Sequence, residues 1–109
     1  MSETSELVSP FVDWVNAYPC AWAMRVNSGL IRLGKRWLKL APKGTPDVLW
    51  CVDGRMYATE FKVGRRNATV AQEREHARMG QAGIVVYVRS DLELAREDVR
   101  AAIADRGER

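Results

Sequence analysis

Residues 44–62 read GTPDVLWCVDGRMYATEFK, and they carry the strongest structural signal in the chain. Two runs rich in β-branched and aromatic residues flank the pair Asp53-Gly54. Such a pair predicts a β-hairpin with a two-residue type I′ turn, because both turn positions require a positive φ. With these two residues as the loop, Val52 faces Arg55 across the hairpin.

Counting outward from that turn places Asp47 opposite Glu60, with Lys62 on the face of Glu60 one pleat further on. Two opposed carboxylates repel each other. The arrangement therefore needs a cation between them, protonation of one acid, or a different turn. Hard divalent cations such as Mg²⁺ bind carboxylate, water and phosphate oxygens. With the amine of Lys62 beside them, the two acids predict metal-assisted hydrolysis of a phosphodiester.

The order Pro46-Asp47 and then Glu60-Phe61-Lys62 looks like the PD-(D/E)xK nuclease signature. Further landmarks make residues 6–103 resemble the stand-alone bacteriophage and bacterial type of the VRR-NUC family. The resemblance implies an α/β fold with a restriction-endonuclease-like core, in which helices flank a mixed central β-sheet in the order α-β-β-β-α-β-α. The further landmarks are Arg25-Val26-Asn27-Ser28-Gly29, Gly44-Thr45, Gln72, Gly83 and Arg89-Ser90.

The same resemblance implies a metal site that binds Mg²⁺, with Mn²⁺ able to substitute. Members of the family carry a glutamate on the first helix, and spacing assigns it to Glu6, or to Asp13 if that helix starts late. Gln72 would orient the scissile phosphate or the attacking water. The implied catalytic residues are Asp47, Glu60, Lys62, Gln72 and Glu6, and the implied metal ligands are Asp47, Glu60, the main-chain carbonyl of Phe61, and Glu6.

The substrate implied by the family is branched DNA, such as a four-way (Holliday) junction, cut by a homodimer whose two-fold axis relates two sites. The alternative enzyme is a nuclease for flaps, ends or specific duplex sites. A DNA-binding module without catalysis is an alternative of another class, and an interaction protein with an incidental motif is a third. Inactive relatives lose an acid or the lysine, and this chain keeps all three.

Composition indicates one domain over residues 1–109, with residues 1–4 and 105–109 expected to fray. The net charge of +3 permits nucleic-acid binding. Cys20 and Cys51 lack metal-site spacing and are expected to be reduced and partly buried. No stretch resembles a signal peptide or a membrane span, which predicts no membrane partner and the cytoplasm of a bacterial or phage-infected cell.

Periodicity and capping signals place the remaining elements. Ser9-Pro10 is also a good helix start, so the first helix could begin late. Thr69 and Ser90 are the expected N-caps of the last two helices, and Gln72 completes a capping box with Thr69. The expected helices are 5–17, 70–79 and 91–104; the other strands are 21–26, 36–40 and 84–88, the last buried on both faces.

Cations gather in residues 30–43, which we expect to form a loop followed by the strand 36–40. They suit contacts with DNA phosphates beside a nuclease site. Trp37 in this segment is expected to be buried in preference to stacking on a base. The lone histidine, His76, is expected to be solvated. The candidate DNA-binding residues are Arg32, Lys35, Arg36, Lys39, Lys43, Arg65 and Arg66.

Overall fold

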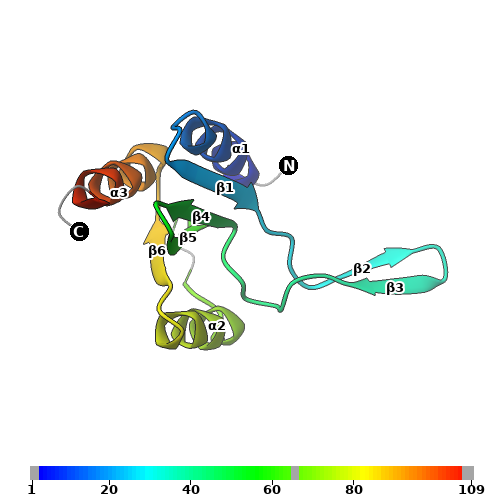
Figure 1. Ribbon diagram of the computed structural model, residues 1–109. Helices are drawn as coiled ribbons and strands as arrows, with labels where there is room; N and C mark the ends of the chain where they lie inside the picture. Colours follow the sequence, from blue (N-terminus) through cyan, green and yellow to red (C-terminus); the bar gives the residue numbers. More distant parts are fainter. Residues whose placement is uncertain (1–2, 65–66, 107–109) are drawn as a thin grey trace.

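The computed structural model describes residues 3–64 and 67–106 and has a mixed α/β fold (Figure 1). Its elements in chain order are α1 (Glu3–Asn16), β1 (Ala21–Arg25), β2 (Leu30–Leu33), β3 (Arg36–Lys39), β4 (Val48–Val52), β5 (Arg55–Phe61), α2 (Val70–Gln81), β6 (Val85–Arg89) and α3 (Leu92–Asp105).

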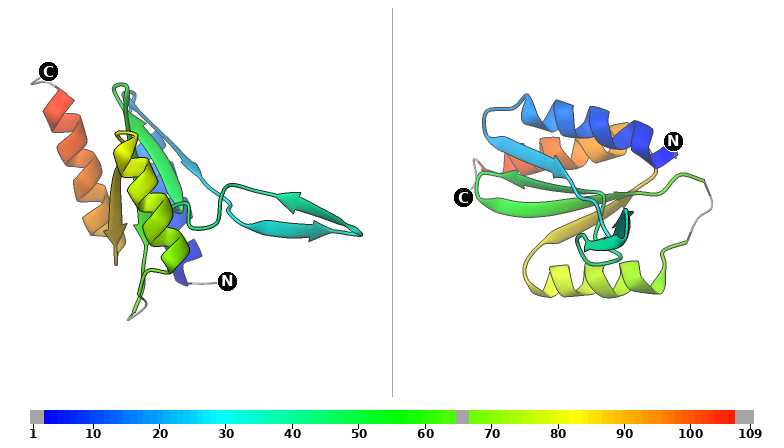
Figure 2. Two further views of the ribbon diagram at one scale, coloured as in Figure 1. Left: turned by 90° about the horizontal axis from the view of Figure 1, so that it is seen from below. Right: turned by 90° about the vertical axis from the view of Figure 1, so that its right-hand side faces the viewer.

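Four strands form the central sheet in the order β1-β4-β5-β6. The strands β1, β4 and β5 are antiparallel neighbours, whereas β6 runs parallel to β5 and is reached through α2, so the sheet is mixed. Helices α1 and α3 cover one face of this sheet and α2 lies on the other (Figures 1 and 2). This arrangement leaves the end of β5 between helices on both sides.

The central hairpin has the predicted turn and register. Asp53 and Gly54 have φ of 49° and 83°, as a type I′ turn requires. Val52 pairs with Arg55, and the pairing continues to Val48 opposite Thr59. One further step along both strands leads to Asp47 and Glu60.

The core lies between the sheet and the pair α1 and α3. Phe11 of α1 meets Phe61 of β5 edge to face, with ring centroids 5.5 Å apart. Trp50 of β4 is fully buried, and its indole N–H donates to the Thr59 hydroxyl at 2.9 Å. Val99 of α3 completes this side with no exposed surface. The core therefore anchors both strands that carry the carboxylates.

The hairpin of β2 and β3 is separate from the central sheet and projects from the body as an arm (Figures 1 and 2). The expected loop at 30–35 is therefore wrong, since Leu30–Leu33 pairs with Arg36–Lys39. Gly34, with φ of 63°, forms part of the tight turn instead of interrupting the strands. The arm, residues 30–39, is exposed along its whole length.

Two other expectations fail locally. The strand β6 is not buried on both faces, because it ends the sheet and leaves Val85 and Val88 nearly half exposed. The N-cap of α3 is Asp91 and not Ser90, since the Asp91 side chain accepts from the Leu94 N–H at 2.9 Å.

The first helix starts early, at Glu3, and keeps Pro10 inside.

Within residues 3–64 and 67–106, no helix is long and apolar enough to span a bilayer.

Candidate active site

Asp47 and Glu60 meet at the open end of the central hairpin. The backbone of Asp47 is tied to the chain after β1, because the Val26 N–H donates to its carbonyl at 2.8 Å. Its carboxylate accepts from the Phe61 N–H, also at 2.8 Å, which ties the Asp47 side chain to the end of β5. Glu60 is only 5% exposed. Asp47 is thus held by two backbone contacts, one through its carbonyl and one through its carboxylate.

Burial is the main reason why the pKa of Glu60 rises from 4.5 to about 8. A hydrogen bond with Asp47 and the charge of that residue raise it further, and the amine of Lys62 opposes the rise. At neutral pH the Glu60 carboxyl is therefore mostly protonated when no cation is near. Of the three ways to relieve the repulsion, the metal-free chain uses protonation of one acid.

Lys62 follows Glu60 by one pleat, as its position in the sequence predicts. Its backbone N–H donates to the Arg89 carbonyl at 2.9 Å, so β6 fixes the chain at this point. Its amine lies near enough to lower the pKa of both Glu60 and His76. A cation here favours ionised acids and can donate to a phosphate oxygen.

The prediction of a solvated His76 is wrong. Its side chain is 16% exposed, and Nε2 lies 3.9 Å from Oε1 of Glu60. Burial, followed by the charge of Lys62, lowers the pKa of the imidazole. Sequence reasoning missed this residue although a signal was present: His76 follows Gln72 by four positions, so both lie on one side of α2.

Gln72 has the predicted role as a cap. The Thr69 side chain accepts from the Gln72 N–H, and the Gln72 amide oxygen accepts from the Thr69 N–H. The amide oxygen is thereby engaged, so the NH₂ group is the part left for a phosphate or a water. Its role in catalysis stays a prediction.

Gly44 brings the loop before Asp47 against the first turn of α2. A Cβ at this position would lie 2.2 Å from the Ala71 carbonyl oxygen and 2.7 Å from the Gln72 nitrogen. Only glycine allows this approach, and its φ of +93° also favours glycine. The contact sets the distance between the strand that carries Asp47 and the helix that carries Gln72 and His76.

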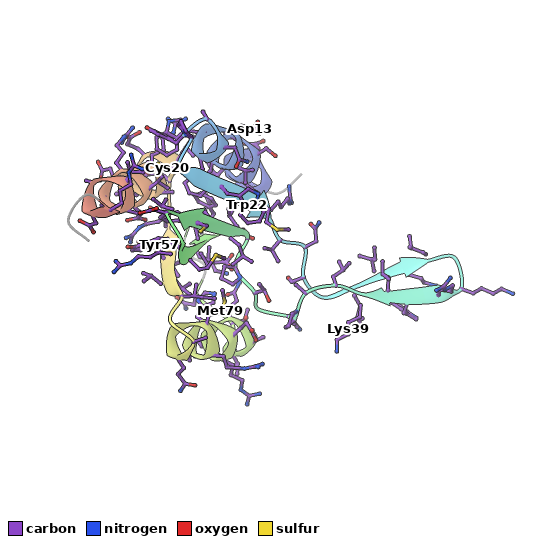
Figure 3. The ribbon with its side chains drawn as sticks, viewed as in Figure 1. Asp13, Cys20, Trp22, Lys39, Tyr57 and Met79 are labelled. Carbon is purple, nitrogen blue, oxygen red and sulfur yellow. The ribbon has the colours of Figure 1, made fainter. Side chains whose placement is uncertain are left out.

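Glu6 reaches the end of β5 from α1. It lines a cavity of about 340 Å³ together with Leu7, Val63, Ser90 and Asp91. Asp13 lies two turns later on α1 and is exposed (Figure 3). Because the helix begins at Glu3, the condition for replacing Glu6 by Asp13 is not met.

The donor set resembles that of a magnesium site completed by water and substrate. Among residues 3–64 and 67–106, no three His, Cys, Asp or Glu side chains converge to hold a metal by themselves. Mg²⁺ typically binds through one or two carboxylates and keeps several waters and phosphate oxygens as ligands. Two adjacent carboxyls, one of them costly to ionise alone, fit this kind of coordination. Cys20 and Cys51 are both free and half-buried.

The arm joins the body directly before Asp47. A cavity of about 640 Å³ lies at the base of the arm, lined by residues 28–30 and 41–43 and by Lys39. A cavity of the same volume lies beside residues 54–57 and 82–85, at the far end of β5 from the carboxylates. The cavity at the base of the arm therefore has the cations Lys39 and Lys43 in its lining, and the two acids are not part of that lining.

The cations Arg32, Lys35, Arg36 and Lys39 are exposed on the arm, and Lys43 is exposed at its base. Arg65 and Arg66 lie outside the described residues. The expected burial of Trp37 is wrong, since its side chain is 65% exposed on a two-stranded ribbon that has no second layer. Figure 3 shows the side chains of the arm, including Lys39, pointing into solvent.

Comparison with models of known protein families gives no match, and no curated protein matches this sequence.

Proposed function

We propose that this protein is a metal-dependent DNA endonuclease of the VRR-NUC type, with a restriction-endonuclease-like core. One observation carries the proposal: Asp47 and Glu60 are paired at the end of the hairpin, with Lys62 beside them. The chain order of the body supports it, because without the arm the elements follow helix, three strands, helix, strand, helix.

In this proposal Asp47 and Glu60 hold Mg²⁺ or Mn²⁺, with the main-chain carbonyl of Phe61 as a further ligand. The bound metal supplies an acidified water and neutralises the charge that builds on the phosphate. Lys62 donates a charged hydrogen bond to the nucleophilic water or to a phosphate oxygen. Gln72 orients one of these groups, and Glu6 contributes a carboxylate from α1.

The proposed substrate is branched DNA such as a four-way junction, and the proposed assembly is a homodimer. The exposed Trp22 and Met24 on β1 support self-association. Because the buried Ala23 lies between them in the strand, both side chains lie on the face opposite that of Ala23 and give this edge strand an apolar surface. A symmetric dimer would present two sites to the two strands of a junction. Light scattering of wild type and Met24→Glu tests the interface, with a monomer expected only for the variant.

The nuclease assay uses labelled junction, flap and linear duplex DNA, each with Mg²⁺ and with EDTA. Cleavage is expected only with Mg²⁺ and fastest on the junction. Asp47→Asn, Glu60→Gln and Lys62→Ala are each expected to lose cleavage by at least about 100-fold. Glu97→Gln, which removes an exposed carboxylate from α3, serves as the matched control. Equal cleavage by the site variants and wild type would discard the site.

A DNA-binding module without catalysis is the second candidate, because the cationic arm would serve it equally well. Its expected result is DNA binding in EDTA and no cleavage of any substrate with Mg²⁺ or Mn²⁺. A nuclease for flaps or ends would instead cut those substrates faster than the junction. Glu6→Gln, measured in the same assay, tests the acid on α1.

A further inference from the structure

The charge of this protein is distributed very unevenly. Residues 26–46 hold five of the seventeen basic residues and none of the fourteen acidic ones, so acids outnumber bases elsewhere. This segment contains the arm and its base. A projecting ribbon with cations and no acids is complementary to a polyanion. It would repel the arm of a second copy.

Strand pairing divides the side chains of the arm between two faces. Arg32 lies opposite Trp37, and Leu30 lies opposite Lys39, so these four share one face. The other face carries the pairs Ile31 with Leu38 and Leu33 with Arg36. The indole of Trp37 and the cations Arg32 and Lys39 thus lie on the same face of the arm. We call this face the Trp37 face.

The Trp37 face has the chemistry of a stacking platform. The guanidinium of Arg32 lies 5.9 Å from the centre of the indole, and its Nε–H donates to the Gly34 carbonyl at 2.9 Å. Arg32 is therefore held beside the ring by the turn of the arm. Trp37 nevertheless stays 65% exposed. Much of its surface is open to a base while cations contact the backbone.

We infer that the Trp37 face binds an unpaired base of the substrate and thereby selects DNA that has single-stranded nucleotides near the cut. Bases inside a continuous duplex are stacked on each other and offer no free π-face, whereas a fork, gap or open junction does. The inference deepens the proposed function: the choice of DNA as ligand and the position of the base relative to the cut rest on that function, whereas the stacking of an unpaired base does not.

The position of the arm limits where that base can lie. Asp47 is ten positions after Trp37, and a fully extended chain of that length spans at most about 35 Å. The real path is shorter, because it turns back at the base of the arm, where Ala41 bridges to Ser28. At about 3.4 Å per nucleotide along a duplex strand, the unpaired base should lie within about ten nucleotides of the cut.

The test measures binding in EDTA, where cleavage cannot interfere. Fluorescein-labelled oligothymidine, a fork with single-stranded arms and a blunt duplex are titrated with protein, and Kd is read by fluorescence anisotropy. Trp37→Ala should weaken binding of oligothymidine and fork by roughly 5- to 150-fold and change duplex binding less than about twofold. Trp37→Phe, which keeps a ring, should recover part of the loss and shows that the arm tolerates substitution.

Leu38→Ala is the matched control, because Leu38 is the next residue on the same strand and points to the opposite face. Its affinity for all three ligands should equal that of wild type. An equal loss on fork and duplex for Trp37→Ala would overturn the inference, as would no loss on either.

The outcome is separable from that of the nuclease proposal. If no substrate is cut but Trp37→Ala still weakens fork binding selectively, the nuclease proposal fails and the stacking inference stands. If cleavage requires Asp47 while Trp37→Ala binds and cuts like wild type, the stacking inference fails alone.

Discussion

Nε2 of His76 lies 3.9 Å from Oε1 of Glu60, across the space between α2 and β5. This nitrogen is buried and has no hydrogen-bond partner among the described residues. The lowered pKa keeps the imidazole neutral at pH 7. An unpaired buried polar atom costs free energy. In the metal-bound protein that we propose, an ionised Glu60 would offer this nitrogen a partner.

His76→Ala is therefore expected to weaken metal binding by about 10- to 100-fold, the usual cost of removing a group that orients a metal-binding carboxylate. His76→Gln, which can still donate to Glu60, should recover much of this loss. Isothermal titration with Mn²⁺ measures the affinity without DNA. The control is Ala77→Ser, an exposed change on the same helix. Equal affinity in His76→Ala and wild type would remove His76 from the site.

Glu60 predicts a pH dependence of folding stability in EDTA. The unfolded residue loses its proton near pH 4.5, whereas the folded one keeps it until about pH 8. The pKa of Glu60 is higher in the folded than in the unfolded protein. The contribution of this residue to the free energy of unfolding is therefore complete below pH 4.5 and is lost as the pH rises to about 8. The loss is at most about 1.4 kcal/mol for each pH unit. Urea unfolding at pH 5 and pH 8 measures it, and Glu60→Gln should flatten this part of the profile.

Gly44→Ala should destabilise the protein much more than Gly29→Ala. The two glycines have almost the same φ, +93° and +92°, so the backbone strain is shared, about 1–2 kcal/mol. Only at Gly44 would the new methyl meet backbone, 2.2 Å from the Ala71 oxygen; Gly29 has open space. Thermal unfolding measures the difference, with about 4–8 °C expected for each kcal/mol in a domain of this size. Equal melting temperatures would mean that the loop and α2 separate freely.

The cations of the arm predict the salt dependence of DNA binding. Lys39→Gln should reduce the slope of log K against log salt concentration by about 0.9 on duplex DNA, the value for one lost phosphate contact. Arg36→Gln tests the other face of the arm in the same way. Arg100→Gln makes the same charge change on α3 and should leave the slope unaltered. A slope that follows net charge alone, equal for all three variants, would argue against the arm as the contact surface.

The local pattern of residues 44–62 was sufficient to predict the central hairpin. A two-residue turn determines register, and register determines which side chains are opposed, so Asp47 and Glu60 could be paired by counting. The capping box of Thr69 and Gln72 is local in the same sense and was confirmed. The family, the metal and the substrate stay predictions.

Features that depend on neighbours along the chain could be predicted from the residues alone. They are the hairpin and its register, the helix that begins after Thr69, and the three chemical groups at the end of β5. Which surfaces are covered depended instead on how distant segments pack together. His76 is partly buried because α2 packs its inner side toward β5, and Trp37 is exposed because its strands pair only with each other. Burial depends on residues distant in sequence, and hydrophobic periodicity does not specify whether a second layer lies above a strand or a helix.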